Sequence, residues 1–284
     1  MYDRSNLKKI CYQGIQGAYS HDAVKKLYPD AVPMACDTFA DALLAVSTQK
    51  ADGAFLPFEN NKAGGVREMH TCLPDITGLH IAGDIWIPIH HALVAATEDI
   101  SRITHIYSHP QALAQCDGFI EEMGVHATEY IDTAAAAQFV KQQNDPTKAA
   151  ICSEEAARIY GMHVLAREIQ DNGESAEQNL TRFFLWQAAS NQNALLTKDI
   201  QKARVSAYYL KTAAPHTAED VWHLMAQKGF VLVKKYGLNT KETKNNTEFY
   251  AEFTLPKGVT PNQLLAARDD MERLCSKVVW FGCF

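Results

Sequence analysis

The stretch Gln178–Leu185, read QNLTRFFL, decides how the rest of the chain is interpreted. Its aromatic and branched residues, continuing to Trp186, predict a buried strand, and Asp171-Asn172-Gly173 upstream predicts a turn. A threonine hydroxyl and a guanidinium therefore lie where a polar loop enters a rigid sheet, which is a usual place for ligand-binding groups. Taken alone, the segment is better explained as a strand with a polar start and an arginine in a surface ion pair.

Both side chains at this strand entry have chemistry that suits a small anionic ligand. The planar guanidinium of Arg182 can donate two parallel hydrogen bonds to a carboxylate, and the hydroxyl of Thr181 can donate one. Whether they serve a ligand has to be decided from the other segments of the chain.

The composition limits the partners of this protein. The chain has 284 residues, which is enough for two domains or for a large domain and a small one. Its net charge of -6 argues against a nucleic-acid or anionic-membrane surface, so neither is expected as a partner. An anionic substrate must then be held by a local cluster of hydrogen-bond donors.

The expected location is cytoplasmic. No apolar run approaches the ~20 residues of a membrane span, and the N-terminal MYDRSNLKKICYQG lacks the apolar core of a signal peptide. The seven cysteines are scattered and never in a CxxC spacing, so we expect reduced thiols.

Strand and helix patterns alternate through the first part of the chain, which predicts an α/β architecture with parallel sheets. Polar residues follow several strand ends, as at Gly14–Ser20 and Glu59–Asn61, where the switch-point rule for open sheets places ligands. The glycine turns at Gly14–Gly17 and Ala63–Val66 also resemble loops that present backbone N–H groups to an anion.

Several helix starts carry a residue that can accept a hydrogen bond from the first backbone N–H groups. The expected caps are Ser20, Ser108, the pair Asp132-Thr133, and Ser153. Upstream, Leu79–Ile89 and His90–Ala96 are expected to be two tightly joined strands.

The C-terminal part has its own pattern. Residues 191–202 are mostly polar, which predicts a linker. Beyond them the predicted order is strand, helix, two strands, helix and strand, the split βαβ pattern of ferredoxin-like units. The predicted ranges are 205–211, 217–228, 230–236, 248–255, 261–276 and 278–281.

Several segments together resemble the prephenate dehydratase family, in the family's order, and the NxTRF run is the most specific of them. The segments are Gly14 to Ser20, Pro57-Phe58-Glu59-Asn60 with Gly64 and Val66, His91, Ser108-His109-Pro110-Gln111-Ala112, Thr133-Ala134-Ala135 and Asn179-Leu180-Thr181-Arg182-Phe183.

The resemblance implies two α/β subdomains around a cleft, like type II periplasmic binding proteins, followed by a ferredoxin-like ACT domain. The catalytic domain is expected over 1–190, with subdomains of about 1–85 with 168–190, and 86–167. An ACT-like regulatory domain is expected over 203–284. The family is a carbon–oxygen lyase of phenylalanine biosynthesis that converts prephenate to phenylpyruvate, with loss of carbon dioxide and water, and needs no metal or organic cofactor.

The resemblance also implies roles for individual residues. Formation of the aromatic ring supplies the driving force of the reaction. What remains for the enzyme is to anchor the two carboxylates of the substrate and to help its hydroxyl leave. Thr181 is the expected donor to the departing oxygen, with Asn60 and Glu59 orienting it or the substrate hydroxyl, although Glu59 equally fits a helix-start carboxylate. The expected substrate-binding residues are Arg182, Ser20, Asn61, Ser108, Gln111, Thr133, Asn179 and Phe183.

Other interpretations stay open. An arogenate dehydratase would perform the same chemistry on the amino analogue, and the sequence does not separate the two substrates. A non-catalytic amino-acid sensor would have the same domains, but the intact NxTRF run argues against it. The histidines show no HxxH or HExxH spacing with a carboxylate partner, so they are read as polar or surface residues rather than metal ligands.

Two places depart from the family pattern. Asn61 stands where members usually have Ser after the Glu-Asn pair, and Lys62 follows it, so a donor is kept and a charge is added. The family's phenylalanine site uses a Gly-Ala-Leu helix start and a Glu-Ser-Arg-Pro run, which this chain lacks at the corresponding stretches. The candidate regulatory residues there are Pro215, Thr217, Leu238 and Asn239. Pairing of ACT sheets into a homodimer or homotetramer is expected all the same.

We therefore hypothesise that feedback control by phenylalanine, the possible effector, is lost, altered or served by another ligand. Enzyme activity measured across a phenylalanine titration tests this. Inhibition with ordinary tight affinity would contradict it.

Overall fold

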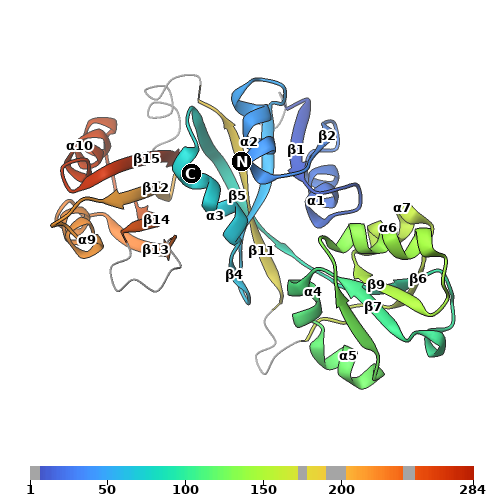
Figure 1. Ribbon diagram of the computed structural model, residues 1–284. Helices are drawn as coiled ribbons and strands as arrows, with labels where there is room; N and C mark the ends of the chain where they lie inside the picture. Colours follow the sequence, from blue (N-terminus) through green and yellow to red (C-terminus); the bar gives the residue numbers. More distant parts are fainter. Residues whose placement is uncertain (1–6, 172–177, 190–202, 239–246) are drawn as a thin grey trace.

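The computed structural model describes residues 7–171, 178–189, 203–238 and 247–284. The predicted linker and Asn239 lie outside the described residues. Within them the chain forms three sheets in a row, with the first sheet between the second and the third (Figure 1). The predicted α/β class with two sheet-containing subdomains and a small C-terminal sheet domain is confirmed.

The first subdomain is built on a sheet with the strand order β2-β1-β3-β11-β5, and the short β4 pairs with β3. β1 runs parallel to β2 and β3, whereas β11 runs antiparallel to β3 and β5. The sheet is therefore mixed rather than purely parallel, because β11 enters it as the chain returns from the second subdomain. Its elements are β1 (Lys9–Gln13), α1 (Tyr19–Leu27), β2 (Val32–Cys36), α2 (Phe39–Ser47), β3 (Gly53–Asn60), β4 (Gly64–Gly65), α3 (Arg67–Cys72), η1 (Leu73–Asp75), β5 (Leu79–Pro88) and β11 (Leu180–Ala188).

The second subdomain has the strand order β10-β6-β9-β7-β8. The two strands expected to be tightly joined, β5 and β6, lie in different sheets, so the chain crosses between subdomains there. Its elements are β6 (Ala92–Ala95), η2 (Ile100–Arg102), β7 (His105–Ser108), α4 (Pro110–Ala114), α5 (Asp117–Met123), β8 (His126–Glu129), α6 (Thr133–Gln143), β9 (Lys148–Cys152), α7 (Glu154–Tyr160) and β10 (His163–Ala166).

Two of the four predicted caps are present and two are not. Asp132 accepts hydrogen bonds from the first turn of α6, and Ser153 accepts one from Ala156 of α7. Ser20, in contrast, lies inside the first turn of α1. Ser108 donates instead to the carbonyl of Ile151 on the neighbouring β9, at 2.6 Å.

The start of α4 is capped by a different side chain. His109 Nδ1 accepts a hydrogen bond from the backbone N–H of Gln111, at 3.2 Å. The imidazole of His109 is therefore the cap of α4, in place of the hydroxyl of the neighbouring Ser108 that was expected.

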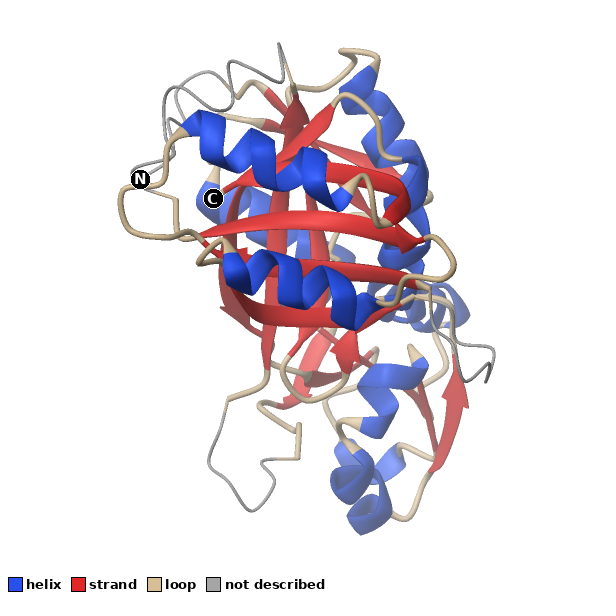
Figure 2. Cartoon of the chain, turned by 90° about the vertical axis from the view of Figure 1, so that its left-hand side faces the viewer, coloured by secondary structure: helices blue, strands red, loops and turns tan. Residues whose placement is uncertain are grey.

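The C-terminal domain has the strand order β13-β14-β12-β15, and all its pairs are antiparallel, which is the ferredoxin-like topology. The last helix is shorter than predicted, because residues from Cys275 onward pair with β12. The elements are β12 (Val205–Thr212), α9 (Ala218–Gln227), β13 (Val231–Gly237), β14 (Glu248–Thr254), α10 (Pro261–Met271) and β15 (Cys275–Cys283). Helices α9 and α10 cover one face of this sheet, which is turned toward the viewer in Figure 2.

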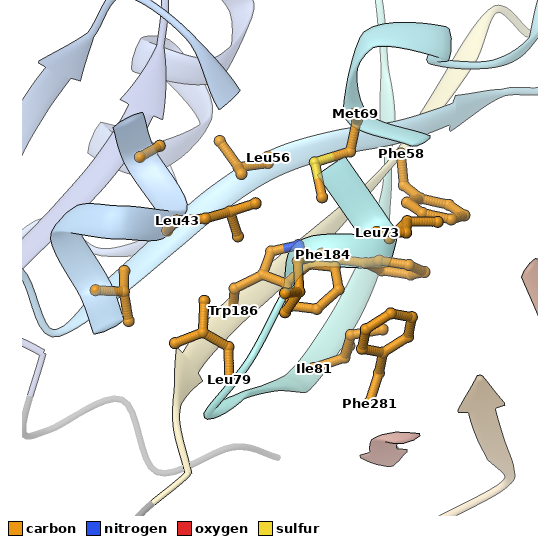
Figure 3. Close-up of a cluster of buried hydrophobic side chains, with 14 of the residues drawn as sticks. Leu43, Leu56, Phe58, Met69, Leu73, Leu79, Ile81, Phe184, Trp186 and Phe281 are labelled. Atoms are coloured by element: carbon orange, nitrogen blue, oxygen red, sulfur yellow. The ribbon is translucent and has the colours of Figure 1, made fainter. Parts of the chain in front are cut away.

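The C-terminal sheet packs on the first subdomain through one shared hydrophobic cluster. Phe58, Phe184 and Trp186 of the first sheet contact aromatic residues of the C-terminal sheet. The Trp186 and Phe281 rings are edge to face at 5.3 Å (Figure 3). A continuous apolar core between two domains fixes their relative position much more firmly than a polar, wet contact does.

Candidate active site

A cavity of about 310 Å³ lies between the two subdomains, a size that suits a small metabolite. Residues of β3, β11 and α1 line it from one side, and residues of α4 and α6 line it from the other. Of the predicted site residues, those that line the cavity are Thr181, Asn60, Ser20, Gln111, Thr133 and Phe183. The other predicted residues, Glu59, Arg182, Asn61, Ser108 and Asn179, do not.

Strand geometry separates Thr181 from Arg182. Successive side chains of a strand point to opposite faces of the sheet, so neighbours cannot both face one ligand. Thr181 lines the cavity, whereas Arg182 contacts carboxylates on the other face, including Glu252 of the C-terminal domain. In this structure Arg182 is therefore not placed to anchor a substrate carboxylate.

Glu59 and Asn60 divide in the same way. Asn60 lies opposite Thr181 in the ladder of β3 and β11, and Glu59 lies opposite Arg182. Asn60 faces the cavity, whereas the Glu59 carboxylate is 2% exposed and pairs with Arg182. The ion-pair explanation that fits the TRF segment alone therefore describes Arg182, but the pair is buried rather than on the surface.

The remaining predicted residues hold the backbone around the cavity. Asn61 binds the chain ahead of β11, because its side chain donates to the carbonyl of Gln178 at 2.9 Å and accepts from the N–H of Leu180 at 2.8 Å. Ser108 is fully buried and ties β7 to β9.

A chain of side-chain hydrogen bonds starts at Thr181 and crosses both connections between the subdomains. Asn60 Nδ2 lies 3.0 Å from Thr181 Oγ1 and 2.7 Å from Asn179 Oδ1. Asn179 Nδ2 donates to Gln115 Oε1 at 3.1 Å, which also lies 2.8 Å from His91 Nε2.

Two backbone groups fix the direction of this chain. The N–H groups of Lys62 and Ala63 donate to Asn60 Oδ1 at 3.0 and 2.9 Å, so Asn60 Nδ2 must be the donor toward Thr181. Because Thr181 Oγ1 already accepts from Asn60, its own O–H hydrogen is left to donate into the cavity.

The same logic assigns the tautomer of His91. Gln115 Oε1 can only accept, so His91 Nε2 carries the proton and Nδ1 is the acceptor for the Tyr19 hydroxyl at 2.6 Å. Burial lowers the pKa of His91, against a smaller opposing effect of the hydrogen bond to Gln115. The neutral imidazole that the chain requires is therefore the favoured form.

The sequence interpretation missed Gln115 and Tyr19 and gave His91 no role. Gln115 stands four positions after Gln111, so the helical spacing that brings residues onto one face was a usable signal. For Tyr19 and His91 the contact joins residues 72 positions apart, and nothing local announces it.

Three N–H groups of the glycine turn after β1 are already bound within the protein. The N–H groups of Gly14, Gly17 and Ala18 are used by the Cys36 carbonyl, by His21 Nδ1 and by the Ile15 carbonyl. Gly17 has a φ of +95°, and a Cβ there would lie 3.1 Å from Ala156, so glycine allows the two subdomains to approach closely.

The described part of the cavity wall carries no strong cation. Among the described residues that line it there are acidic side chains, Glu68 and Asp132, but neither lysine nor arginine. The neutral donors on the cavity wall include Thr133 and Gln111, whereas the start of α6 is already capped by the Asp132 carboxylate. In the described ranges no group of three or more His, Cys, Asp or Glu side chains is arranged to hold a metal ion.

The candidate regulatory residues that the structure describes, Pro215, Thr217 and Leu238, belong to the C-terminal domain and do not line this cavity. Thr217 caps α9 in a reciprocal arrangement with Asp220. Leu238 packs against the shared hydrophobic cluster. Pro215 lies in the connection between β12 and α9.

The fold and cavity geometry define the chain as a two-subdomain α/β protein of the kind built to enclose a small ligand. A family model described as prephenate dehydratase matches residues 10–191, and the chain belongs to that family. Similar curated proteins include arogenate dehydratase 3, chloroplastic, from Arabidopsis thaliana, with 40% identity over 64% of this chain and 42% of the relative. Arogenate dehydratase 1 from Petunia hybrida is 39% identical over 62% of this chain and 41% of the relative. The chain thus matches less than half the length of these relatives.

Two solved structures share the whole architecture. Prephenate dehydratase from Arthrobacter aurescens in complex with L-Phe has a TM-score of 0.81 at 24% identity and covers 97% of this chain and 89% of its own. A protein described as GqqA, a novel type of quorum quenching acylases, has a TM-score of 0.79 at 25% identity, with 97% of both chains covered. The C-terminal domain is therefore part of the shared fold. No helix within the described ranges has the length and apolar character to cross a membrane.

The direction of the hydrogen-bond chain predicts the state of His91. We expect NMR of the ligand-free protein to find the Nε2-protonated tautomer, with a pKa below the ordinary 6.5, so that the ring stays neutral as the pH falls through that value. In a Gln115→Met variant the pKa should fall further, because the hydrogen bond to Gln115 raises it. An Nδ1-protonated ring, or a pKa above 6.5, would contradict the assigned direction.

Proposed function

We propose that this protein is a dehydratase that acts on prephenate or its amino analogue arogenate, releasing carbon dioxide and water as the ring becomes aromatic. For prephenate the product is phenylpyruvate, in the biosynthesis of phenylalanine. The observation that carries the proposal is the hydrogen bond from Asn60 to the oxygen of Thr181 on the cavity wall, from which we infer that the Thr181 O–H donates into the cavity.

The reaction needs a hydrogen bond to an oxygen that departs as the ring carboxylate leaves. As the bond to that carboxylate breaks, carbon dioxide forms, the electron pair of the bond enters the ring, and the hydroxyl leaves with developing negative charge and takes a proton from solvent to become water. A donor aimed at this oxygen stabilises the transition state more than the ground state. Thr181 is our candidate for this donor. The groups behind it are amides and a neutral imidazole, so they orient the hydroxyl and do not deliver a proton through it.

The remaining cavity residues would hold the substrate. Ser20, Gln111 and Thr133 are candidate donors to its carboxylates, and Phe183 is a candidate contact for its ring. Asn179 would act through Asn60, because it contacts that side chain and does not line the cavity.

A specific observation favours arogenate as the second candidate substrate. Prephenate brings two carboxylates to a cavity lined by Glu68 and Asp132, with no lysine or arginine among the described residues that line it. Arogenate carries an ammonium group that offsets one of its carboxylates, so an acidic cavity disfavours it less. Many of the curated relatives also carry arogenate dehydratase in their names.

One of the similar solved structures is named as an acylase, which suggests acyl transfer as another reaction. The catalytic groups in the cavity support that reaction less well than the dehydration. An acylase that used Thr181 as nucleophile would need a base that accepts its proton. Its neighbour Asn60 donates to the Thr181 oxygen instead.

We also keep as proposals an ACT-type role for the C-terminal domain, an amino-acid effector there, and a homo-oligomer formed through its sheet. The ferredoxin-like topology supports the first, and the L-Phe named with the Arthrobacter structure supports the second. A cytoplasmic location also remains a prediction, since the relatives named chloroplastic work elsewhere.

Incubation of the purified protein with prephenate and, separately, with arogenate tests the proposal. We expect phenylpyruvate from the first substrate or phenylalanine from the second, and the ratio of the two kcat/KM values gives the preference. Tight binding of either compound without turnover would instead support the amino-acid sensor and refute the enzyme.

Removing the Thr181 hydroxyl should slow the chemical step. Thr181→Ala is expected to lower kcat by about 10²–10³-fold with little change in KM, as for loss of one directed donor to a developing oxyanion. Thr181→Ser should keep much of the rate, because it retains the hydroxyl. Equal kcat values for Thr181→Ala and the unchanged protein would remove Thr181 from the mechanism.

Asn60→Asp is the matched control for the direction of this hydrogen bond. A carboxylate still accepts from the N–H groups of Lys62 and Ala63, but it cannot donate to Thr181. The Thr181 O–H would then turn toward Asp at this position, and kcat should fall although the hydroxyl is present. A normal kcat in this variant would refute the assigned direction.

A further inference from the structure

Two charged side chains beside the cavity residues point away from the cavity and meet the C-terminal domain. Arg182 follows Thr181 along β11, and Glu59 precedes Asn60 along β3. We propose that Glu252 of the C-terminal domain is a positioning residue for the active site and acts through Arg182. The kinetic part of this proposal rests on the dehydratase activity proposed above.

Arg182 is held by carboxylates from three elements. Its Nη1 donates to Glu252 Oε1 of β14 at 2.7 Å and to Glu59 Oε1 of β3 at 3.0 Å. Its Nε donates to Asp84 Oδ2 of β5 at 2.7 Å. The Arg182 side chain is 8% exposed, and those of Glu59 and Glu252 are 2% and 3% exposed, so most of this network is shielded from water.

The C-terminal domain also controls the second oxygen of Glu59. The Nζ of Lys234 and the hydroxyl of Tyr236 both donate to Glu59 Oε2. Burial alone would raise the pKa of Glu59, but the hydrogen bonds from Lys234, Tyr236 and Arg182 outweigh it and lower the pKa. Glu59 therefore joins the two domains. Its Oε1 accepts from Arg182 of the first subdomain, and its Oε2 accepts from Lys234 and Tyr236 of the C-terminal domain.

The surroundings of the network are apolar. The Arg182 guanidinium carbon lies 4.9 Å from the centre of the Phe184 ring and 5.8 Å from that of the Phe284 ring. In such a medium a charge that loses its partner is not compensated by water, so the guanidinium has to follow its carboxylates. A change at Glu252 is consequently transmitted to Arg182 rather than absorbed by solvent.

The strand ladder connects this network with the cavity. Arg182 lies opposite Glu59 in the ladder of β11 and β3, and the next pair along is Thr181 opposite Asn60. One pair points to the C-terminal domain and the next to the cavity. A shift or tilt of β11 at Arg182 therefore displaces the Thr181 hydroxyl from Asn60, on which its direction depends.

Two variants of the C-terminal domain separate positioning from simple docking. Glu252→Gln removes the charge that binds Arg182 and keeps an acceptor of similar shape for the Tyr250 hydroxyl. The control, Lys228→Met, removes an ion pair with Asp270 that lies within the C-terminal domain, away from the first subdomain. Each variant loses one ion pair, but only Glu252→Gln removes an ion pair with a residue of β11, namely Arg182.

In kinetic assays well below the unfolding temperature, Glu252→Gln should lower kcat about tenfold with a change in KM of less than about threefold. Lys228→Met should leave both constants unchanged. If Glu252→Gln lowers only the unfolding temperature and keeps the kcat of the unchanged protein, the network merely docks the domain and the proposal is overturned.

A readout that needs no turnover keeps this test apart from that of the proposed function. The methyl resonance of Thr181 in the full chain should shift in Glu252→Gln and stay in place in Lys228→Met. Should Glu252→Gln fail to fold, Tyr236→Phe removes one hydrogen bond to Glu59 without changing any charge and should shift the same resonance. A Thr181 resonance that is unmoved in the folded variants overturns the proposal whether or not the protein turns over prephenate or arogenate.

Discussion

The alternation of side chains along β11 is the constraint on which the site depends. Thr181 faces the cavity and Arg182 faces the C-terminal domain, because neighbours in a strand point to opposite faces. The partner strand repeats the division, with Asn60 opposite Thr181 and Glu59 opposite Arg182. One pair of strands therefore carries a neutral, hydrogen-bonded face toward the ligand and a charged, buried face toward the neighbouring domain.

The backbone, rather than any charged group, determines the donor-to-acceptor direction of the hydrogen-bond chain that starts at Thr181. The N–H groups of Lys62 and Ala63 can only donate, and that fixes which way the Asn60 amide points. The orientation of Asn60 then determines which atom donates in each following hydrogen bond. On one side this is the bond to Thr181, and on the other side the bonds that lead through Asn179 and Gln115 to His91. Since Gln115 belongs to the second subdomain, the approach of the two subdomains helps to hold the Thr181 hydroxyl in place.

The sequence predicts what is decided locally. The caps Asp132 and Ser153 were predictable because each bonds to residues two or three positions away. Ser108 was assigned wrongly as a cap because its hydroxyl finds the carbonyl of Ile151, 43 positions on. Likewise, period-two alternation already forbade Thr181 and Arg182 from sharing a ligand, but no local signal announces Glu252, 70 positions from Arg182.

The separation of charge also suits the decarboxylating reaction that we propose. A guanidinium beside the carboxylate that leaves would stabilise a negative charge that the transition state disperses, and so would favour the ground state. Neutral donors can fix the substrate without that penalty. Placing Arg182 on the far face, saturated by Glu59, Asp84 and Glu252, removes the strongest nearby cation from the cavity while its charge still holds β11 in position. In our proposal, the arginine of the TRF run contributes to the site through the strand it anchors, and not through contact with the substrate.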